Sequence, residues 1–218
     1  MKFKPQNPQP NHLKNPQSEI RNPQSAIRNT KYEIVTIGAS LGGLEALKTI
    51  CSGISEGFPL PVVIVQHRSA YRDGKLLCQI LQEHSRLPVG EVEDKEAILG
   101  GRIYIAPSDY HLLIEKGSFA LSIEAPVEYA RPAIDVMFES AADVYGDKTI
   151  GVVLTGANED GASGVKRIKE KGGMVIVQDP ATAESPVMPK AAIAAAKVDY
   201  ILPLSEIAGL LMKTVNGE

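Results

Sequence analysis

The chain has 218 residues, of which 44% are hydrophobic, and a formal net charge of −3. Its basic residues are spread out, so there is neither the clustered charge typical of nucleic-acid binding nor a polybasic run for a membrane surface. No apolar run approaches the roughly 20 residues that span a bilayer, and the amino terminus lacks a signal-peptide core. Cys51 and Cys78 lie in apolar helical patterns typical of reduced core thiols, so we expect a cytoplasmic protein.

Residues 1–30 differ from the rest of the chain. They are rich in Asn, Pro and Gln and carry a tandem repeat, NPQSEIR at 15–21 followed by NPQSAIR at 22–28. Two copies of seven residues are too few to build a solenoid. Because the segment has little apolar surface to offset the entropy of ordering, we predict a disordered tail over 1–30 and one domain over 31–218.

From Lys31 onward, short apolar runs alternate with helical periodicity. The apolar runs predict strands at 32–38, 61–67, 102–107, 149–156, 174–179 and 200–203. The helical pattern covers 41–52, 73–84, 132–145, 163–173, 189–197 and 205–213, with Asp73 as an N-cap and Pro132 in the first turn. HLLIE and FALSIE predict a hairpin around residues 116–118. This alternation predicts an α/β fold: a doubly wound, mostly parallel sheet with helices on both faces and an antiparallel hairpin.

Three polar residues follow three of the predicted strands. Ser40 comes after the first strand, His67 after the second, and Asp160 shortly after the run at 149–156. Ligands of such folds bind beyond the carboxyl ends of the strands, so these side chains are expected at one edge. A serine hydroxyl needs a base to take its proton, imidazole is such a base, and a carboxylate orients the imidazole. The three residue types therefore suit nucleophilic catalysis.

The sequence around Ser40 has the spacing G-x-S-x-G, read as Gly38-Ala39-Ser40-Leu41-Gly42. Glycines at this spacing relieve crowding in a sharp strand-to-helix turn and leave the hydroxyl exposed. Backbone N–H groups at Leu41 or Gly42, at the start of the next helix, could stabilise an oxyanion. The order Ser, His, Asp differs from the order in α/β-hydrolases, so a triad here would be a separate solution to the same geometry.

Other interpretations of these residues stay open at this point. Ser40 could form a turn or donate to a bound phosphate, His67 could be structural, and Asp160 could cap the following helix. The second hypothesis is therefore a non-catalytic module that binds a phosphate or a receptor segment. Dinucleotide binding is disfavoured because position 40 is Ser where G-x-G-x-x-G needs Gly. Neither cysteine has a partner at metal-ligand spacing, so we expect no metal and no other cofactor.

At these residues the sequence resembles the catalytic domain of the chemotaxis-receptor protein-glutamate methylesterases (CheB-type). The resemblance covers essentially all of residues 33–214. Its stretches are IGASLGG, VVIVQHRS, GGRIYIAPSDYHL, RPAIDVMFESAA, GVVLTGANEDGASG and VQDPATAESPVMPKAAI.

This resemblance implies hydrolysis of glutamate methyl esters on methyl-accepting chemotaxis receptors, with release of methanol, and in many members deamidation of receptor glutamines. It implies that Ser40 is the nucleophile, His67 the base and Asp160 the orienting acid, without a cofactor. It also implies a doubly wound parallel sheet with an antiparallel hairpin.

The chain departs from the family pattern in two respects. Ala157 stands where many members have Met, which leaves only its backbone N–H for an oxyanion role. The usual amino-terminal receiver domain is not expected within residues 1–30. Three alternatives follow: the domain works without phosphorylation control, a separate regulatory protein governs it, or the regulated parent gene has been split. Arg131 is a candidate to bind a substrate carboxylate, and Met188 is a candidate substrate contact, with an exposed arginine and ordinary packing as their alternatives.

Overall fold

A computed structural model describes residues 30–68 and 74–217, and its main feature is a seven-stranded parallel sheet. The strand order is β3-β4-β2-β1-β7-β8-β9, and every neighbouring pair is parallel. The strands are β1 (Ile34–Ala39), β2 (Val62–Gln66), β3 (Val89–Glu91), β4 (Ile103–Ile105), β7 (Thr149–Val153), β8 (Met174–Gln178) and β9 (Tyr200–Leu202). The predicted fold class is confirmed.

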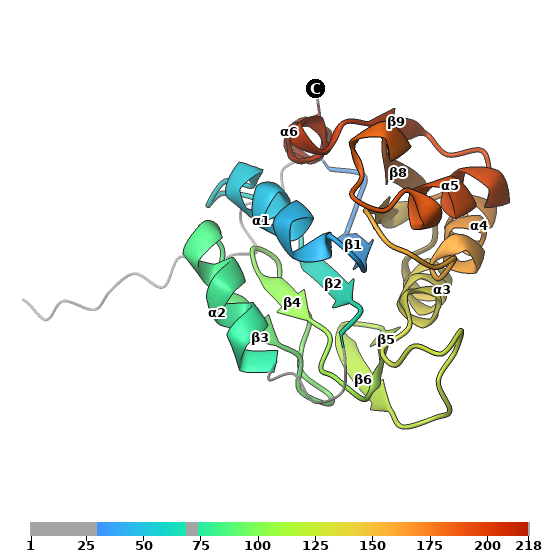
Figure 1. Cartoon of the computed structure of the whole chain (residues 1–218). Helices are drawn as coiled ribbons and strands as arrows, with labels where there is room; N and C mark the ends of the chain where they lie inside the picture. The colour runs from blue at the N-terminus through green and yellow to red at the C-terminus, as the bar shows by residue number, and fades with distance from the viewer. Residues whose placement is uncertain (1–29, 69–73, 218) are drawn as a thin grey trace, which may run out of the picture.

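Helices cover both faces of this sheet (Figure 1). One face carries α1 (Gly43–Gly53), α2 (Gly74–His84) and α6 (Leu204–Asn216). The other carries α3 (Ile134–Tyr145), α4 (Ala162–Glu170) and α5 (Val187–Ala195). Two short 3-10 turns, η2 (Gly146–Lys148) and η3 (Pro180–Thr182), complete these connections. None of the helices in the described part of the chain is long and apolar enough to cross a membrane.

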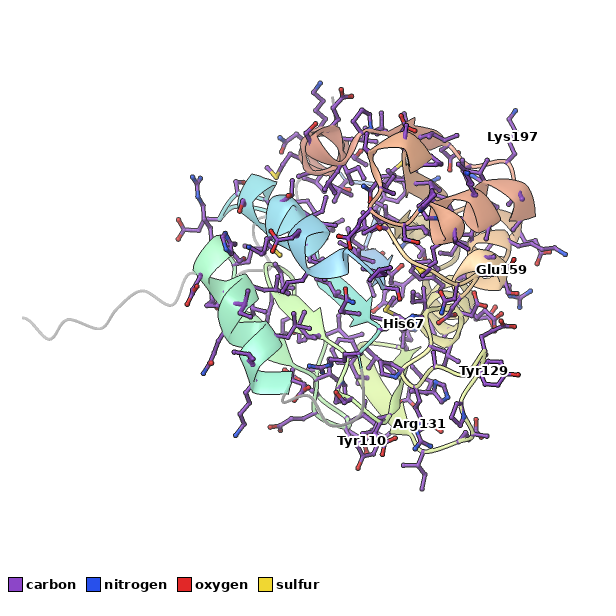
Figure 2. All side chains as sticks on the ribbon, viewed as in Figure 1. His67, Tyr110, Tyr129, Arg131, Glu159 and Lys197 are labelled. Atoms are coloured by element: carbon purple, nitrogen blue, oxygen red, sulfur yellow. The ribbon has the colours of Figure 1, made fainter. Side chains whose placement is uncertain are left out.

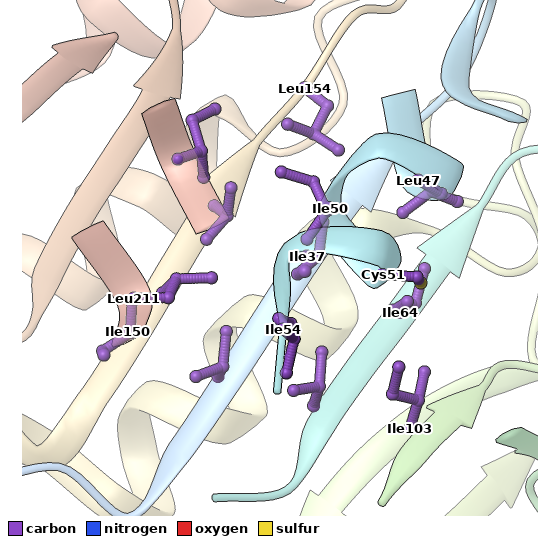
Figure 3. Packing of buried hydrophobic residues seen from close by; sticks show 14 of the residues in the cluster. Ile37, Leu47, Ile50, Cys51, Ile54, Ile64, Ile103, Ile150, Leu154 and Leu211 are labelled. Atoms are coloured by element: carbon purple, nitrogen blue, oxygen red, sulfur yellow. The ribbon is translucent and has the colours of Figure 1, made fainter. Parts of the chain in front are cut away.

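Alternating side chains of the central strands pack in two separate hydrophobic cores, one on each face of the sheet. On β2, Val62 and Ile64 point to the core under α1, whereas Val63 and Val65 point to the core under α3. Figure 3 shows the first core, in which Leu47 and Ile50 of α1 pack on Ile37 and Ile64 of the sheet. Burial of each such side chain contributes about 1.5–3 kcal/mol, which explains why near-continuous apolar runs form these strands.

Both cysteines are free thiols of the α1 side. Cys51 is buried in the core shown in Figure 3, and Cys78 packs against the same core from α2. Burial raises the pKa of the Cys51 thiol to about 12. The prediction of reduced core thiols is therefore confirmed for the described residues.

The predicted hairpin forms a separate two-stranded antiparallel sheet of β5 (His111–Glu115) and β6 (Ser118–Ser122). Its tight turn contains Gly117 at φ 81°, a conformation that favours glycine. Phe119, Leu112 and Ile114 join the core under α3. The hairpin therefore covers the α3 side of the sheet.

Three details differ from the sequence-based expectation or lie beyond the structure. The strand β3 was missed because three half-buried residues carry no recognisable period. Helix α3 begins at Ile134 with Ala133 as N-cap, so the prediction of Pro132 in its first turn is wrong; the Arg131–Pro132 peptide is cis. The predicted N-cap Asp73 and residues 1–29 of the predicted tail lie outside the described residues.

The strand order places the carboxyl end of β1 at a switch point. From β1 the chain moves outward through β2 on one side, and it later returns to pair β7 on the other side. In doubly wound sheets such a reversal opens a crevice beyond the strand ends. The segments that follow β1, β2 and β7 therefore meet in one place, and they carry Ser40, His67 and Asp160.

Candidate active site

Ser40 occupies the tight bend between β1 and α1. Its own N–H donates to the carbonyl of Thr155 (2.9 Å), and its carbonyl accepts from the N–H of Gly43 (2.9 Å). Gly42, the N-cap of α1, has φ 78°, which a residue with a side chain adopts only at a cost. The bend therefore depends on glycine and presents the Ser40 hydroxyl at the strand end.

The register of β1 and β2 brings His67 beside Ser40. Ala39 pairs with Gln66, and the His67 N–H donates to the Ala39 carbonyl (2.9 Å). Nδ1 of His67 then lies 3.2 Å from Oγ of Ser40. Figure 2 shows His67 at the tip of β2.

Asp160 meets the opposite side of the imidazole. Its Oδ2 lies 2.7 Å from Nε2 of His67 and also accepts the N–H of Ile134 (2.7 Å). Its Oδ1 accepts the N–H of Asp135 (2.9 Å), and the residue is 1% exposed. A carboxylate at Nε2 fixes the tautomer with the proton on Nε2, which leaves the Nδ1 lone pair facing the Ser40 hydroxyl. The geometry is that of a nucleophile, a base and an orienting acid in sequence.

The structure bears on one alternative interpretation of Asp160, that it caps the helix that follows it. The N-cap of α4 is Gly161, so Asp160 does not cap the helix that follows it. It accepts instead from the first N–H groups of α3, where the positive end of the helix dipole favours a negative charge.

Three backbone N–H groups near Ser40 could bind an oxyanion. Within the described residues, those of Leu41, Gly42 and Ala157 donate no hydrogen bond, whereas those of Gly43 and Gly156 are already engaged. Free donors at a helix start, beside the nucleophile, are suited to a negative oxygen.

An open cleft of about 700 Å³ lies over Ser40 and His67. It is lined by Ser40, His67, Arg68 and Asn158, by Asp109, and by residues of the 126–132 segment before α3. Figure 2 shows Tyr129 and Arg131 on this segment, and Tyr129 is fully exposed at the rim. A cleft of this size accepts a side chain presented by a larger molecule. No group of three or more His, Cys, Asp or Glu residues in ranges 30–68 and 74–217 could hold a metal ion.

A family model described as CheB methylesterase matches residues 35–211. The chain belongs to this family.

Two relatives and one solved structure of the CheB methylesterase family are similar over the same region. A relative from Leptospira interrogans, provisionally named protein-glutamate methylesterase/protein-glutamine glutaminase, is 51% identical over 84% of this chain and 94% of its own length. Protein-glutamate methylesterase/protein-glutamine glutaminase 1 of Carboxydothermus hydrogenoformans is 46% identical over 81% of this chain and 53% of its own length. The crystal structure of the Thermotoga maritima CheB methylesterase catalytic domain is 38% identical, with a TM-score of 0.78, and covers 84% of this chain and 98% of that chain.

In this family member, the two predicted substrate contacts have different settings. Arg131 lines the cleft, but its guanidinium already holds Asp109 through two bonds (2.6 and 3.1 Å) and donates to the carbonyls of Ile123 and Glu124. Met188 is 1% exposed, and it packs in the core beside Gly156. Of the two interpretations offered for Met188, the structure therefore favours ordinary packing, because its side chain is enclosed by the core under α3.

Two polar residues of the site were not found from the sequence. Gln66 donates from Nε2 to the carbonyls of both Ser40 (2.8 Å) and His67 (2.9 Å), which ties the two strand ends together. Asn158 places Nδ2 3.3 Å from Nδ1 of His67, beside the Ser40 hydroxyl. Gln66 directly precedes His67, and Asn158 lies two residues before Asp160, so nearness in sequence was the available signal.

Proposed function

We propose that this CheB methylesterase-family chain is a protein-glutamate methylesterase that uses Ser40, His67 and Asp160. The observation that carries the proposal is the continuous contact from Ser40 Oγ through the His67 ring to the buried Asp160 carboxylate. The names of the relatives give the substrate class, and the cleft above Ser40 gives the room for it.

In the first half of the reaction, Ser40 Oγ attacks the ester carbonyl carbon while Nδ1 of His67 accepts the hydroxyl proton. The Asp160 carboxylate stabilises the imidazolium through Nε2–H. The carbonyl oxygen becomes an oxyanion, which the free N–H groups of Leu41, Gly42 or Ala157 stabilise. The C–O bond to the methoxy group then breaks, His67 returns the proton, and methanol leaves from an acyl-Ser40 intermediate.

In the second half, water replaces methanol and the same groups act again. His67 accepts a proton from water as its oxygen attacks the acyl carbon, and then returns it to Ser40 Oγ. The products are a glutamate side chain and the free Ser40 hydroxyl, so one water is consumed for each methanol released. A glutamine side chain follows the same route with ammonia as the leaving group, which accounts for the glutaminase activity in the relatives' names.

The partners in this proposal are the methylated cytoplasmic helices of methyl-accepting chemotaxis receptors. The enzyme would then work in the cytoplasm, and its control by a separate regulatory protein is part of the same proposal. Arg131 lies in the cleft wall, but its bonds to Asp109 must be exchanged before it can bind a substrate carboxylate.

Methanol release from purified methylated receptor tests the proposal. We expect release by the wild-type chain and a loss of at least about 10⁴-fold in Ser40→Ala, because the variant lacks the hydroxyl that attacks the ester. The matched control is Ser52→Ala, since Ser52 is an exposed serine of α1 that bonds the Lys48 carbonyl, and it should retain full activity. Full activity in Ser40→Ala would refute the proposal. Receptor or phosphate binding by the wild-type chain with no methanol or ammonia released would favour the binding module instead.

A further inference from the structure

Asp135 is a buried carboxylate that the proposed reaction does not use. It is the second residue of α3 and is 7% exposed. Its backbone N–H is one of the two donors that hold Asp160. Burying a carboxylate costs free energy, so a buried carboxylate in contact with a residue that holds the orienting acid is expected to have a role.

The first turns of α3 and α4 are linked by reciprocal hydrogen bonds to two carboxylates. Asp160, just before α4, accepts the N–H groups of Ile134 (2.7 Å) and Asp135 (2.9 Å) of α3. Asp135 accepts in return the N–H of Gly164 (2.7 Å), the third residue of α4. Each helix start is thus capped by a carboxylate from the other, which satisfies donors that a helix leaves unpaired.

The two first turns are also in close contact. A Cβ on Gly164 would lie 2.4 Å from Cβ of Phe138, and one on Gly161 would lie 3.0 Å from Cγ2 of Ile134. Because there is no spare room between the turns, a movement of α3 against α4 would displace Asp160 from His67.

Asp135 has acidic neighbours rather than a cation. Its pKa is raised to about 6, chiefly by burial and in addition by the charges of Asp160 and Glu139, while the N–H groups of Gly164 and Gly161 act in the opposite direction. On α4, Lys166 is exposed to solvent, and Arg167 and Lys169 lie in the last turn.

The other elements packed on α3 carry few ionisable groups. Glu115, at the end of β5, is paired with Lys95. On β5, Nδ1 of His111 accepts the Ala133 N–H, and its Nε2 lies 3.0 Å from the Ala125 carbonyl oxygen. Strands β1, β2 and β7 contain no ionisable residue, and Asp147 and Lys148 of η2 lie beyond the far end of α3. On the other side of the relay, the Arg68 guanidinium that follows His67 is paired with Glu91.

We propose that Asp135 is a positioning residue for the relay. It clamps the first turns of α3 and α4 so that Asp160 stays against His67, and in its ionised form it adds a second negative charge behind Asp160 that favours the imidazolium. This inference rests on the proposed hydrolase function of Ser40, His67 and Asp160.

The test is the pH dependence of Ser40 labelling by a fluorophosphonate in wild type and Asp135→Asn. Asparagine keeps the volume and one acceptor but removes the charge, so imidazolium is less favoured. We expect the low-pH side of the labelling-rate profile, its acid limb, to move to lower pH by about half a unit or more, since charges inside a protein are screened less than in water. An acid limb that stays in place would overturn the proposal, even if the rate falls at every pH.

Asp143→Asn is the matched control, because Asp143 is an exposed carboxylate on the same helix, paired with Arg167 and Lys171. It should leave the acid limb unchanged. If Asp135→Asn does not fold, the wild-type chain gives a second test through the ring NMR signals of His67. Coupling to Asp135 broadens the titration to a Hill slope below one, and a slope of one would overturn the proposal. Absence of any Ser40 labelling in wild type would instead count against the hydrolase function, and the NMR titration would still test the coupling.

Discussion

Oδ2 of Asp160 lies 2.7 Å from Nε2 of His67, so the carboxylate faces the ring nitrogen that is farther from the backbone. Nδ1 is therefore the nitrogen that faces the serine, which is the reverse of the arrangement in the chymotrypsin-type triad. A triad is defined by the roles of its groups, and either ring nitrogen can act as the base if the other is held by a carboxylate.

This geometry makes Asp160→Asn a severe change. Both oxygens of Asp160 accept from N–H groups, so an asparagine NH₂ must face a donor in either orientation. If it faces Nε2, the ring carries its proton on Nδ1 and cannot accept one from Ser40. We expect kcat to fall by about 10³–10⁴-fold with little change in KM.

Asp179→Asn is the control for this variant. Asp179 is another aspartate just after a strand, where it accepts the N–H of Ala181. Its replacement should leave kcat unchanged in the same assay of methanol release. Equal losses in the two variants would contradict the role of Asp160.

Gln66→Met tests the link between the two strand ends. Methionine has a similar length but cannot donate to the carbonyls of Ser40 and His67. Each of these bonds contributes about 1 kcal/mol, so we expect kcat to fall by about 10–100-fold. Gln82→Met removes an amide that bridges the carbonyls of Ser85 and Leu87 far from the site, and it should lower the free energy of unfolding without lowering kcat.

Gly156→Ala should displace the nucleophile. A Cβ at this position would lie 2.0 Å from Sδ of Met188 and 2.9 Å from Cβ of Ser40. Because a shift of about 1 Å in a reacting group is costly, we expect a loss of kcat of at least about tenfold. Gly209→Ala in α6 meets no atom within 4 Å, and it should retain activity while raising stability by about 0.5–1 kcal/mol. Wild-type kcat in Gly156→Ala would show that Ser40 does not depend on this close packing.

The buried Asp135 carboxylate predicts a pH dependence of stability. Its pKa rises from 3.8 to about 6 on folding, chiefly through burial, so the folded chain binds this proton more tightly. The contribution of Asp135 to the free energy of unfolding is complete below pH 3.8 and is lost as the pH rises through about 6. Urea unfolding at pH 4 and pH 7 should therefore show a smaller decline in Asp135→Asn than in wild type, by on the order of 1–3 kcal/mol.

The control for this prediction has the opposite sign. Lys171 and Arg167 lower the pKa of the exposed Asp143, so its contribution is present above the unfolded pKa and is lost as the pH falls. Asp143→Asn should not reduce the decline between pH 4 and pH 7. An Asp135→Asn profile parallel to that of wild type would contradict the prediction.

Patterns within single elements were sufficient to predict most of the fold. Local sequence is enough to recognise the apolar runs of β1, β2 and β7 and the polar residues that follow them. The expectation that Ser40, His67 and Asp160 share one edge of the sheet came from the same local patterns. Strand β3 was missed because its pairing with β4, and not its own composition, makes it a strand.

The supporting residues depend on contacts between distant segments. Gln66 bridges two carbonyls only because β1 and β2 pair in one register, and Asp135 meets Gly164 only because two helix starts converge. Burial favours ordinary packing for Met188, one of the two interpretations that its sequence left open. Such relationships have no signature in a single sequence, whereas the polar residues at strand ends do.

The most direct test of the central claim is covalent labelling with a fluorophosphonate, followed by mass spectrometry of the peptides. An Oγ activated by His67 should give one adduct per chain, located on Ser40, at a rate that falls at least about 10³-fold in His67→Gln. Labelling of a different residue, or an undiminished rate in His67→Gln, would contradict the assignment of Ser40 and His67 as nucleophile and base.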